Sequence, residues 1–234
     1  NDWPEKSFPS AADLDAAFPD RPVWLSRIDG HAGWANTSAM RAVQRDLSGT
    51  WQPDGGAIQR DAAGKPTGIF VDNAMALLEE ARPATSEATA ERALVLGMQA
   101  AVQHGLTGVH DAGISLAELQ RYQRLADRGA MPLRIYAMAD GNGAALESLC
   151  ANGLYRHASG RLQMRAVKLY ADGALGSRGA AMLEDYSDDH GNRGLLVMSA
   201  QELADAAAKA RRCGVQAATH AIGDRGNRLT LDTY

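Results

Sequence analysis

The sequence predicts an α/β fold in which consecutive β/α units build a parallel sheet. From Thr85 onward, short apolar runs typical of strands alternate with longer segments of helical period, which is the pattern of a parallel sheet with crossover helices. Three of these runs end in ionisable residues, where the functional groups of such proteins gather. About six strand candidates occur in the whole chain, fewer than the eight that close a parallel barrel.

The first part of the chain, residues 1–84, is predicted to hold an early strand, a polar loop and a Gly-rich excursion. Asn36 is well placed to cap a short helix. Residues 49–64 are rich in Gly, Asp and Pro, which indicates a loop or hairpin. Two short strands flank these features, R-P-V-W-L-S-R-I-D at 21–29 and T-G-I-F-V-D at 67–72.

The second part, residues 85–234, is predicted to contain consecutive β/α units of the same barrel-like sheet, ending before closure. An Ala-rich helix extends from Ser86 to His104, and Ser115 with Glu118 forms a capping box that opens the next helix. Strands are expected at T-G-V-H-D (107–111), P-L-R-I-Y-A-M-A (132–139), M-R-A-V-K-L-Y-A-D (164–172) and G-V-Q-A-A-T-H (214–220).

Composition excludes several classes of function. The net charge is −4 with both signs interspersed, so the basic stripe that nucleic-acid binding requires is absent. No apolar run is long enough to cross a bilayer.

Cys150 and Cys213 lie far apart without paired spacing, so we expect two buried core residues and no disulfide or cysteine-ligated metal. The chain starts without Met or a signal pattern, so we expect the natural start to be missing; the cytoplasm is only a default location.

Lys168 ends a candidate strand whose two-residue period places it with Ala166, Tyr170 and Asp172, opposite the apolar residues between them. A lysine that faces the interior is costly to desolvate unless it is paired, neutralised or modified. The pattern leaves three interpretations open. Lys168 is a carbamylated ligand that bridges two metal ions, a Schiff-base nucleophile, or the partner of Asp172 or another acid in a structural ion pair.

His220 ends the run G-V-Q-A-A-T-H and shares a face with Gln216 and Ala218. An imidazole at this position is a natural ligand for zinc or a related metal. A structural, hydrogen-bonded histidine is the alternative for any lone His. Asp224 follows in a polar loop that leads into a helix, and this context favours the metal-ligand interpretation.

Polar and aromatic side chains in two other stretches are candidates for substrate contacts. The run D-G-H-A-G-W-A-N holds His31, Trp34 and Asn36, a group suited to lining a ligand pocket, although Trp34 is equally suited to a core. His110, at the end of T-G-V-H-D, is a further candidate, with hydrogen bonding to backbone as its structural alternative.

The loop D-G-A-L-G-S-R-G-A supplies the last two candidates, Asp172 and Arg178. It is rich in Gly but lacks the Walker lysine and the spacing of a dinucleotide fingerprint, so a nucleotide site is disfavoured. Arg178 is predicted to hold a substrate carboxylate or carbonyl, or else to be a solvated loop arginine.

Four ordered motifs together resemble the amidohydrolase superfamily, and more narrowly the branch that includes N-substituted formamide deformylases. They extend from about Trp3 to Asn227: R-P-V-W-L-S-R-I-D-G-H-A-G-W-A-N, G-V-H-D-A-G, V-K-L-Y-A-D-G-A-L-G-S-R-G-A and T-H-A-I-G-D-R-G-N. The resemblance implies a (β/α)8 TIM-type barrel and one or two divalent metal ions, zinc being expected, that activate water for hydrolysis of a non-peptide C–N bond in a small amide-type substrate. Lys168 then matches the carbamylated bridging ligand and His220 the ligand of the following strand, which favours metal over a Schiff base.

The family pattern also extends past both ends of the chain. Its first-strand His-x-His pair would precede Asn1, and its later histidine and its proton-shuttle aspartate would follow Tyr234. The resemblance therefore implies that this chain alone is a catalytically inactive fragment of a barrel, with open strand edges that favour pairing with another copy. Two other hypotheses remain: a metal-free lyase or aldolase that uses Lys168 as a Schiff base, and a structural or binding module without chemistry.

Overall fold

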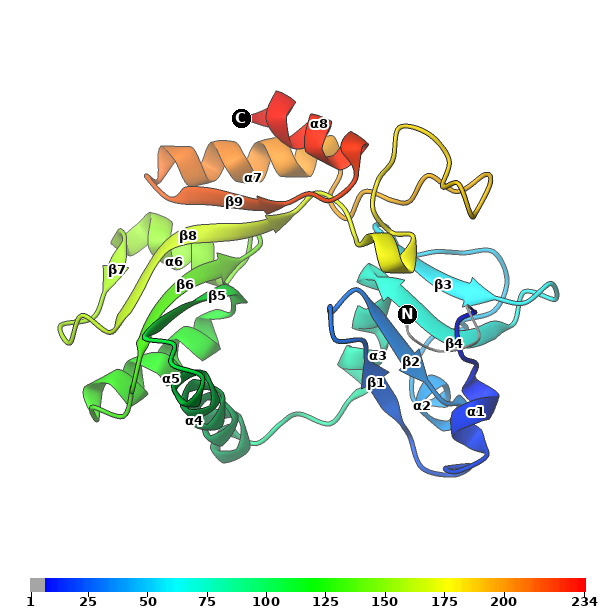
Figure 1. The fold of residues 1–234 in the computed structure, drawn as a ribbon, viewed down its shortest axis with the longest axis horizontal. Coiled ribbons are helices and arrows are strands. Elements are labelled where there is room, and N and C mark those ends of the chain that lie inside the picture. The colour runs from blue at the N-terminus through cyan, green and yellow to red at the C-terminus, as the bar shows by residue number, and fades with distance from the viewer. Residues whose placement is uncertain (1–6) are drawn as a thin grey trace. The chain divides into compact units, whose positions relative to one another are not determined.

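The structure is a computed structural model that describes residues 7–234, so Trp3, where the family resemblance begins, lies outside the described residues. The chain forms two compact units, both drawn in Figure 1. The first unit comprises the residues up to Pro83 with 171–199 and 221–232, and the second comprises 84–170, 200–220 and 233–234. The sequence pattern assigned everything after residue 84 to one run of β/α units, whereas residues 171–199 and 221–232 belong to the first unit.

The first unit is an antiparallel sheet with the strand order β1-β2-β4-β3. Phe70, Ile58 and Leu78 form its core, with Trp24 packed against them. Strands β3 and β4 make a hairpin in and after the Gly-rich stretch, and Asn36 caps α2, both as predicted. The elements are α1 (Ala11–Asp15), β1 (Trp24–Ser26), β2 (Ala32–Ala35), α2 (Thr37–Arg41), β3 (Gly56–Arg60), β4 (Pro66–Asp72), η1 (Asn73–Met75), α3 (Ala76–Ala81), η2 (Leu175–Ser177) and most of α8 (Asp224–Thr233).

The second unit contains a sheet in which β5, β6, β8 and β9 are parallel and β7 is antiparallel to β8. The predicted alternation of strands and helices, and with it the α/β fold class, is confirmed; among the described residues the sheet stays open. Its elements are α4 (Glu87–Gln103), β5 (Gly108–Ile114), α5 (Leu116–Asp127), β6 (Arg134–Asp140), α6 (Ala144–Asn152), β7 (Tyr155–Arg156), β8 (Leu162–Tyr170), α7 (Ala200–Arg212) and β9 (Gln216–His220).

Strand β8 carries a bulge at Arg165, because one step along β6 is matched there by two steps along β8. An extra residue reverses the alternation of side chains between the two faces. The face that packs against the helices therefore holds even-numbered residues before the bulge and odd-numbered residues after it. These residues are apolar and fully buried: Leu162, Met164, Val167 and Leu169. Lys168 is left half-buried on the opposite, open face of the sheet.

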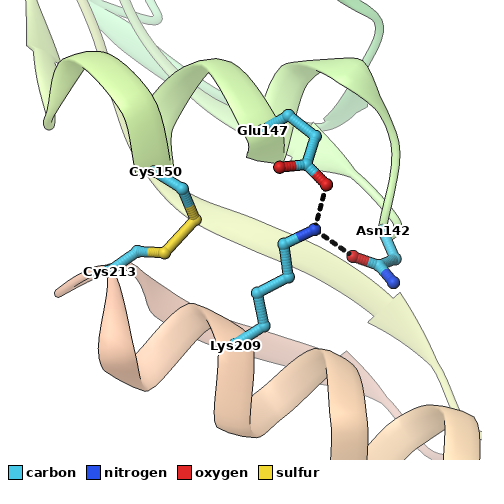
Figure 2. Close-up of a disulfide and its surroundings, with 5 residues drawn as sticks. All are labelled: Asn142, Glu147, Cys150, Lys209 and Cys213. Atoms are coloured by element: carbon cyan, nitrogen blue, oxygen red, sulfur yellow. Dashed lines mark hydrogen bonds and ion pairs between the residues drawn. A yellow bond between two sulfur atoms is a disulfide. The ribbon is translucent and has the colours of Figure 1, made fainter.

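Cys150 and Cys213 form a disulfide, so the prediction of two separate core cysteines was wrong. Their Cα atoms are 4.9 Å apart across 63 residues of sequence, because α6 and the end of α7 lie side by side. Figure 2 shows the bond next to Lys209, which pairs with Glu147 and donates to the Asn142 side chain at 2.9 Å. Sequence spacing does not reveal such a pair, since the two helices are brought together only by the sheet. Among the described residues, no helix has the length and apolar character needed to span a membrane.

Candidate functional site

Lys168 lies near the carboxyl end of β8, on the open face of the parallel sheet. Its Nζ is 3.7 Å from the centroid of the Tyr170 ring and 3.4 Å from the carbonyl oxygen of Leu169. Burial lowers the pKa of the Lys168 ammonium, and the negative charge of Asp140 opposes this shift. The direction of this shift is toward the neutral amine, which is the nucleophilic form of lysine.

His220 and Asp140 lie on the same face as Lys168, on the two neighbouring strands. Asp140 of β6 pairs in register with Lys168, while His220 of β9 pairs with Tyr170. The ring centroids of Tyr170 and His220 are 6.1 Å apart. The carboxyl ends of three adjacent parallel strands thus gather a lysine, an imidazole, a carboxylate and a phenol, as expected for the functional edge of such a sheet.

Gly113 makes room for part of this cluster. It occupies a bulge in β5 with a φ of 107°, and a Cβ there would lie 3.0 Å from the Tyr170 hydroxyl and 3.2 Å from Asp140 Oδ1. Burial raises the pKa of the Tyr170 hydroxyl, and the nearby Asp140 charge adds to the shift, so the phenol remains a proton donor. Sequence reasoning missed Asp140 and Tyr170, although Asp140 directly follows a predicted strand and the strand-end rule applies to it.

The described part of this cluster fits a portion of a metal centre. The residues offer an imidazole and a lysine whose neutral amine can accept carbon dioxide to become a carboxylate-type ligand. Within residues 7–234, no group of three or more His, Cys, Asp or Glu is arranged to hold a metal ion. Zinc sites use three or four protein ligands, so a site built on Lys168 and His220 would need one or two more.

His31 and Asp72 form a close pair in the first unit. The Nδ1 atom of His31 is 2.7 Å from Oδ1 of Asp72, whose side chain is 3% exposed. Asp72 adopts φ 49° and ψ −125°, a conformation that costs a non-glycine residue about 1–3 kcal/mol. A carboxylate against Nδ1 fixes the orientation of the imidazole. Sequence reasoning found His31 but not Asp72, although Asp72 ends a predicted strand.

Glycine residues in the loop after β8 accommodate Asp72. A Cβ at Gly173 would lie 2.1 Å from Oδ2 of Asp72, and a Cβ at Gly179 would lie 2.4 Å from the same atom. Both distances are far shorter than any real contact, so the loop requires glycine at these positions. The Gly-rich motif is therefore explained by the packing of a buried carboxylate rather than by phosphate binding.

Asn36 has a structural role in place of the substrate contact predicted from sequence. Its Oδ1 accepts hydrogen bonds from the backbone of Val23 and Ala39, and its Nδ2 donates to the carbonyls of Phe18 and Arg21. These four bonds use the whole capacity of the amide. The side chain is fully buried, so no donor or acceptor is left for a ligand.

Asp172 is also structural rather than a substrate ligand. The fully buried carboxylate accepts hydrogen bonds from the backbone N–H groups of Ala181, Ile222 and Gly223, at 2.8–2.9 Å. It thereby ties the loop that follows β8 to the loop that follows β9. With its oxygens committed in this way, Asp172 is not available as the ion-pair partner considered for Lys168.

His110 lies near the start of its strand and not at its end, which corrects the sequence assignment. Strand β5 continues to Ile114, and His110 stacks edge to face on Tyr136 at a centroid distance of 5.0 Å. Tyr136 lies four residues before the partner of Lys168 on β6, which corresponds to roughly 13 Å along the strand. His110 is thus distant from Lys168 along the sheet, while its neighbour Asp111 faces the helices and accepts from Tyr122.

Trp34 and Arg178 line the same cavity of the first unit, which has a volume of about 770 Å³. Trp34 is half-buried and donates from Nε1 to the Ser10 carbonyl. Arg178 has a φ of 54° and pairs with Asp188 at 2.9 Å. The structure thus brings two of the predicted substrate residues to one cavity.

Comparison with known proteins gives one consistent set of relatives. The model of the amidohydrolase family matches residues 1–234. The putative amidohydrolase YtcJ of Bacillus subtilis (strain 168) is 36% identical, with 91% of this chain and 40% of the relative aligned. The protein LONG AFTER FAR-RED 3 of Arabidopsis thaliana is 32% identical, with 100% of this chain and 42% of the relative aligned. An N-substituted formamide deformylase of Arthrobacter pascens is 30% identical, with 98% of this chain and 44% of the relative aligned. The chain spans less than half the length of these relatives.

Solved structures support the same fold. An uncharacterized metal-dependent hydrolase from Pyrococcus horikoshii OT3 matches with a TM-score of 0.69 and 25% identity, over 97% of this chain and 44% of that one. A second such hydrolase, from Pyrococcus furiosus, matches with a TM-score of 0.66 and 24% identity, over 97% of this chain and 45% of that one.

Proposed function

The chain belongs to the amidohydrolase family, and we propose that the protein is a metal-dependent hydrolase that cleaves a non-peptide C–N bond, such as that of an amide or formamide. The observation that carries the proposal is the placement of Lys168. A bulge in β8 turns this lysine away from the helices, and burial lowers the pKa of its ammonium. The imidazole of His220 lies on the adjacent strand and on the same face.

Lys168, as its carbamate, and His220 are the residues that would hold a divalent ion, with zinc the expected metal. When bound, the ion supplies a Lewis acid that polarises the scissile carbonyl and activates water. The structural neighbour from Pyrococcus horikoshii OT3 is titled a metal-dependent hydrolase, which supports the presence of a metal ion. A further ligand or two is needed beyond these residues.

The remaining residues of the cluster would act on the substrate directly. Tyr170 retains its proton because burial raises its pKa, so it can donate a hydrogen bond to a carbonyl or leaving-group atom. Asp140 counterbalances positive charge at the same edge of the sheet. His31, Trp34 and Arg178 remain proposed substrate contacts in the first unit, whereas Asn36, His110 and Asp172 do not.

Metal analysis of the natural gene product tests the proposal. After incubation with zinc and bicarbonate, elemental analysis should find at least one ion per chain, and Lys168→Ala and His220→Ala should each reduce the bound metal at least tenfold. Lys65→Ala is the matched control, since that lysine is exposed in a turn, and it should bind metal normally. Failure to bind metal, together with unchanged amide hydrolysis in Lys168→Ala, would contradict the proposal.

A Schiff-base lyase or aldolase is the second candidate, and the lowered pKa of Lys168 favours it as well, because a neutral amine attacks carbonyl carbon. Borohydride reduction in the presence of an aldehyde or ketone distinguishes the two. Under this second candidate, mass spectrometry would find the reduced adduct on Lys168 in metal-free protein, with turnover unaffected by a chelator. Under the hydrolase proposal, a chelator abolishes turnover.

A further inference from the structure

The chain contains two Asn-Gly dipeptides, one at each end of helix α6. Asn142 and Gly143 lie in the loop that joins β6 to α6, whereas Asn152 and Gly153 lie where the same helix ends. All four residues are exposed. Asparagine is thermolabile, because the backbone nitrogen of the next residue can attack its side-chain amide. Glycine hinders this attack least, since it has no Cβ. The two dipeptides thus share their chemistry and differ in their surroundings.

The backbone nitrogen of Gly143 is available for this attack. Gly143 is the N-cap of α6, and the first N–H groups of a helix have no partner within the helix. Within residues 7–234, the Gly143 N–H makes no hydrogen bond. The Gly153 N–H, in contrast, donates to the Leu149 carbonyl at 2.9 Å and closes the last turn of the helix. That bond must break before Gly153 can attack Asn152.

Asn142 also has a cation at its amide oxygen. The Nζ atom of Lys209 donates to Oδ1 of Asn142 at 2.9 Å and pairs with Glu147 (Figure 2). The Lys209 side chain is only 22% exposed, so its charge is partly shielded from water. When a nucleophile attacks the amide carbon, negative charge develops on the oxygen, and a fixed ammonium group beside it lowers the barrier. In the described part of the chain, Asn152 has no cation at the corresponding atom.

We propose that Asn142 is a site of spontaneous deamidation, promoted by the free Gly143 N–H and by the Lys209 ammonium. The Gly143 nitrogen loses its proton to water and bonds to Cγ of Asn142. The Cγ–Nδ2 bond then breaks and releases ammonia, which leaves a cyclic succinimide. Water opens this ring at either carbonyl and gives aspartate or isoaspartate at position 142. The sum is asparagine plus water giving an aspartyl residue plus ammonia, with no oxidant, reductant or metal.

The product changes a loop beside the candidate site. Deamidation adds a negative charge two residues after Asp140, and isoaspartate lengthens the backbone by one carbon atom. In the same loop, the N–H of Gly141 donates to the Lys168 carbonyl at 2.9 Å. The modification therefore introduces a time-dependent charge and an irregular backbone next to the strand end that carries Lys168.

Peptide mass spectrometry of the aged chain tests the proposal, with the second dipeptide as an internal control. The folded chain is incubated at mildly alkaline pH, reduced and cleaved after Glu147, which places Asn142 and Asn152 on separate peptides. The peptide with Asn142 should gain one mass unit at least tenfold faster than the peptide with Asn152. In a chain unfolded by urea the two rates should agree within about twofold, because both dipeptides are then free of the fold.

Two variants assign the rate to the two groups named. Gly143→Ala should slow the modification of Asn142 at least tenfold. The fold accepts this alanine, since φ is −96° and the new Cβ would lie 3.5 Å from the Asp140 carbonyl oxygen, an ordinary contact. Lys209→Gln should slow the modification at least threefold. Arg211→Gln is its control, because Arg211 is exposed on the same helix and does not contact Asn142, and it should leave the rate unchanged.

Three outcomes would overturn the proposal. They are an absence of mass gain at Asn142 in the folded chain, equal rates at Asn142 and Asn152 before unfolding, and an unchanged or faster rate in Lys209→Gln. None of these measurements depends on hydrolase activity or on bound metal, so the proposal is tested separately from the proposed function.

Discussion

Asp172 illustrates how far a single buried carboxylate can determine local structure. Its neighbours in the sequence, a lysine at a strand end and a Gly-rich loop, suggested a substrate ligand. In the structure its oxygens instead bind three backbone N–H groups from two loops. A sequence shows that an acidic residue lies in a loop but not which backbone groups donate to it, so the structural role of Asp172 could not be predicted.

Asp172→Ala is therefore expected to destabilise the protein strongly. Two of the three backbone donors, those of Ala181 and Gly223, lose a charged acceptor and remain buried. At about 1–3 kcal/mol each, their loss should lower the free energy of unfolding by about 2 kcal/mol or more. Asp224→Ala is the control, since Asp224 also accepts backbone hydrogen bonds but is exposed, and should cost about 1 kcal/mol or less. Urea denaturation measures both, and equal losses would refute the structural role of Asp172.

Tyr122 provides a pH-dependent contribution to stability. Burial, with the hydrogen bond to Asp111 at 2.7 Å, raises the pKa of the Tyr122 hydroxyl well above its usual range. The folded state therefore retains this proton after the unfolded chain has lost it. Tyr122 therefore contributes fully to the free energy of unfolding below about pH 10, the usual pKa of tyrosine, and this contribution declines as the pH rises further.

Tyr122→Phe tests this contribution. At neutral pH it should lower the free energy of unfolding by about 1.5–3 kcal/mol, the value of a hydrogen bond to a charged group. The difference from wild type should shrink between pH 10 and 11. Tyr155→Phe is the control, because that hydroxyl makes no hydrogen bond within residues 7–234. A difference that does not change with pH would exclude the proposed linkage.

At the scale of elements, side-chain caps in the sequence predicted where two of the helices begin. The Ser115 and Glu118 capping box opens α5 and Asn36 caps α2, both as predicted. Helix α6 was not predicted, and its N-cap is Gly143, which offers no side-chain acceptor. The bulge at Arg165 was also invisible, because it is a property of the pairing between β6 and β8 and not of either strand alone.

The disulfide is the element-scale feature with the largest expected energetic effect. It closes a loop of 63 residues between α6 and the end of α7, for which the chain-entropy model gives about 4 kcal/mol as an upper value and typical measurements give about 2–4 kcal/mol. Cys150→Ser with Cys213→Ser should therefore lower the free energy of unfolding by about that amount.

Reducing agent provides the control for this double substitution. It should destabilise the wild-type chain to the same extent and leave the double variant unchanged, as measured by thermal denaturation. A wild-type chain that is equally stable with and without reductant would contradict a stabilising disulfide.

At the scale of the whole molecule, the sequence was informative about the parallel sheet and less so about how the chain divides. The order of strands and helices indicated the α/β class, which the structure and its relatives confirm. The assignment of 171–199 and 221–232 to the first unit depends on contacts between residues far apart in the sequence. Asn73 donates to the Val197 carbonyl, and Asp172 accepts from Gly223. The strand-end residues Lys168 and His220 were identified from the sequence. Asp140 and Asp72 were missed although each lies at the end of a predicted strand, while the place of Tyr170 beside His220 depends on the pairing of β8 with β9.

The proposed hydrolase depends on carbamylation of Lys168 as a metal ligand, which carbon-13 NMR can detect. The natural gene product, incubated with zinc and ¹³C-bicarbonate, should show one carbamate resonance per chain that is lost in Lys168→Ala and retained in Lys65→Ala. The absence of any carbamate resonance in zinc-loaded protein, or its persistence in Lys168→Ala, would show that Lys168 is not a carbamylated ligand.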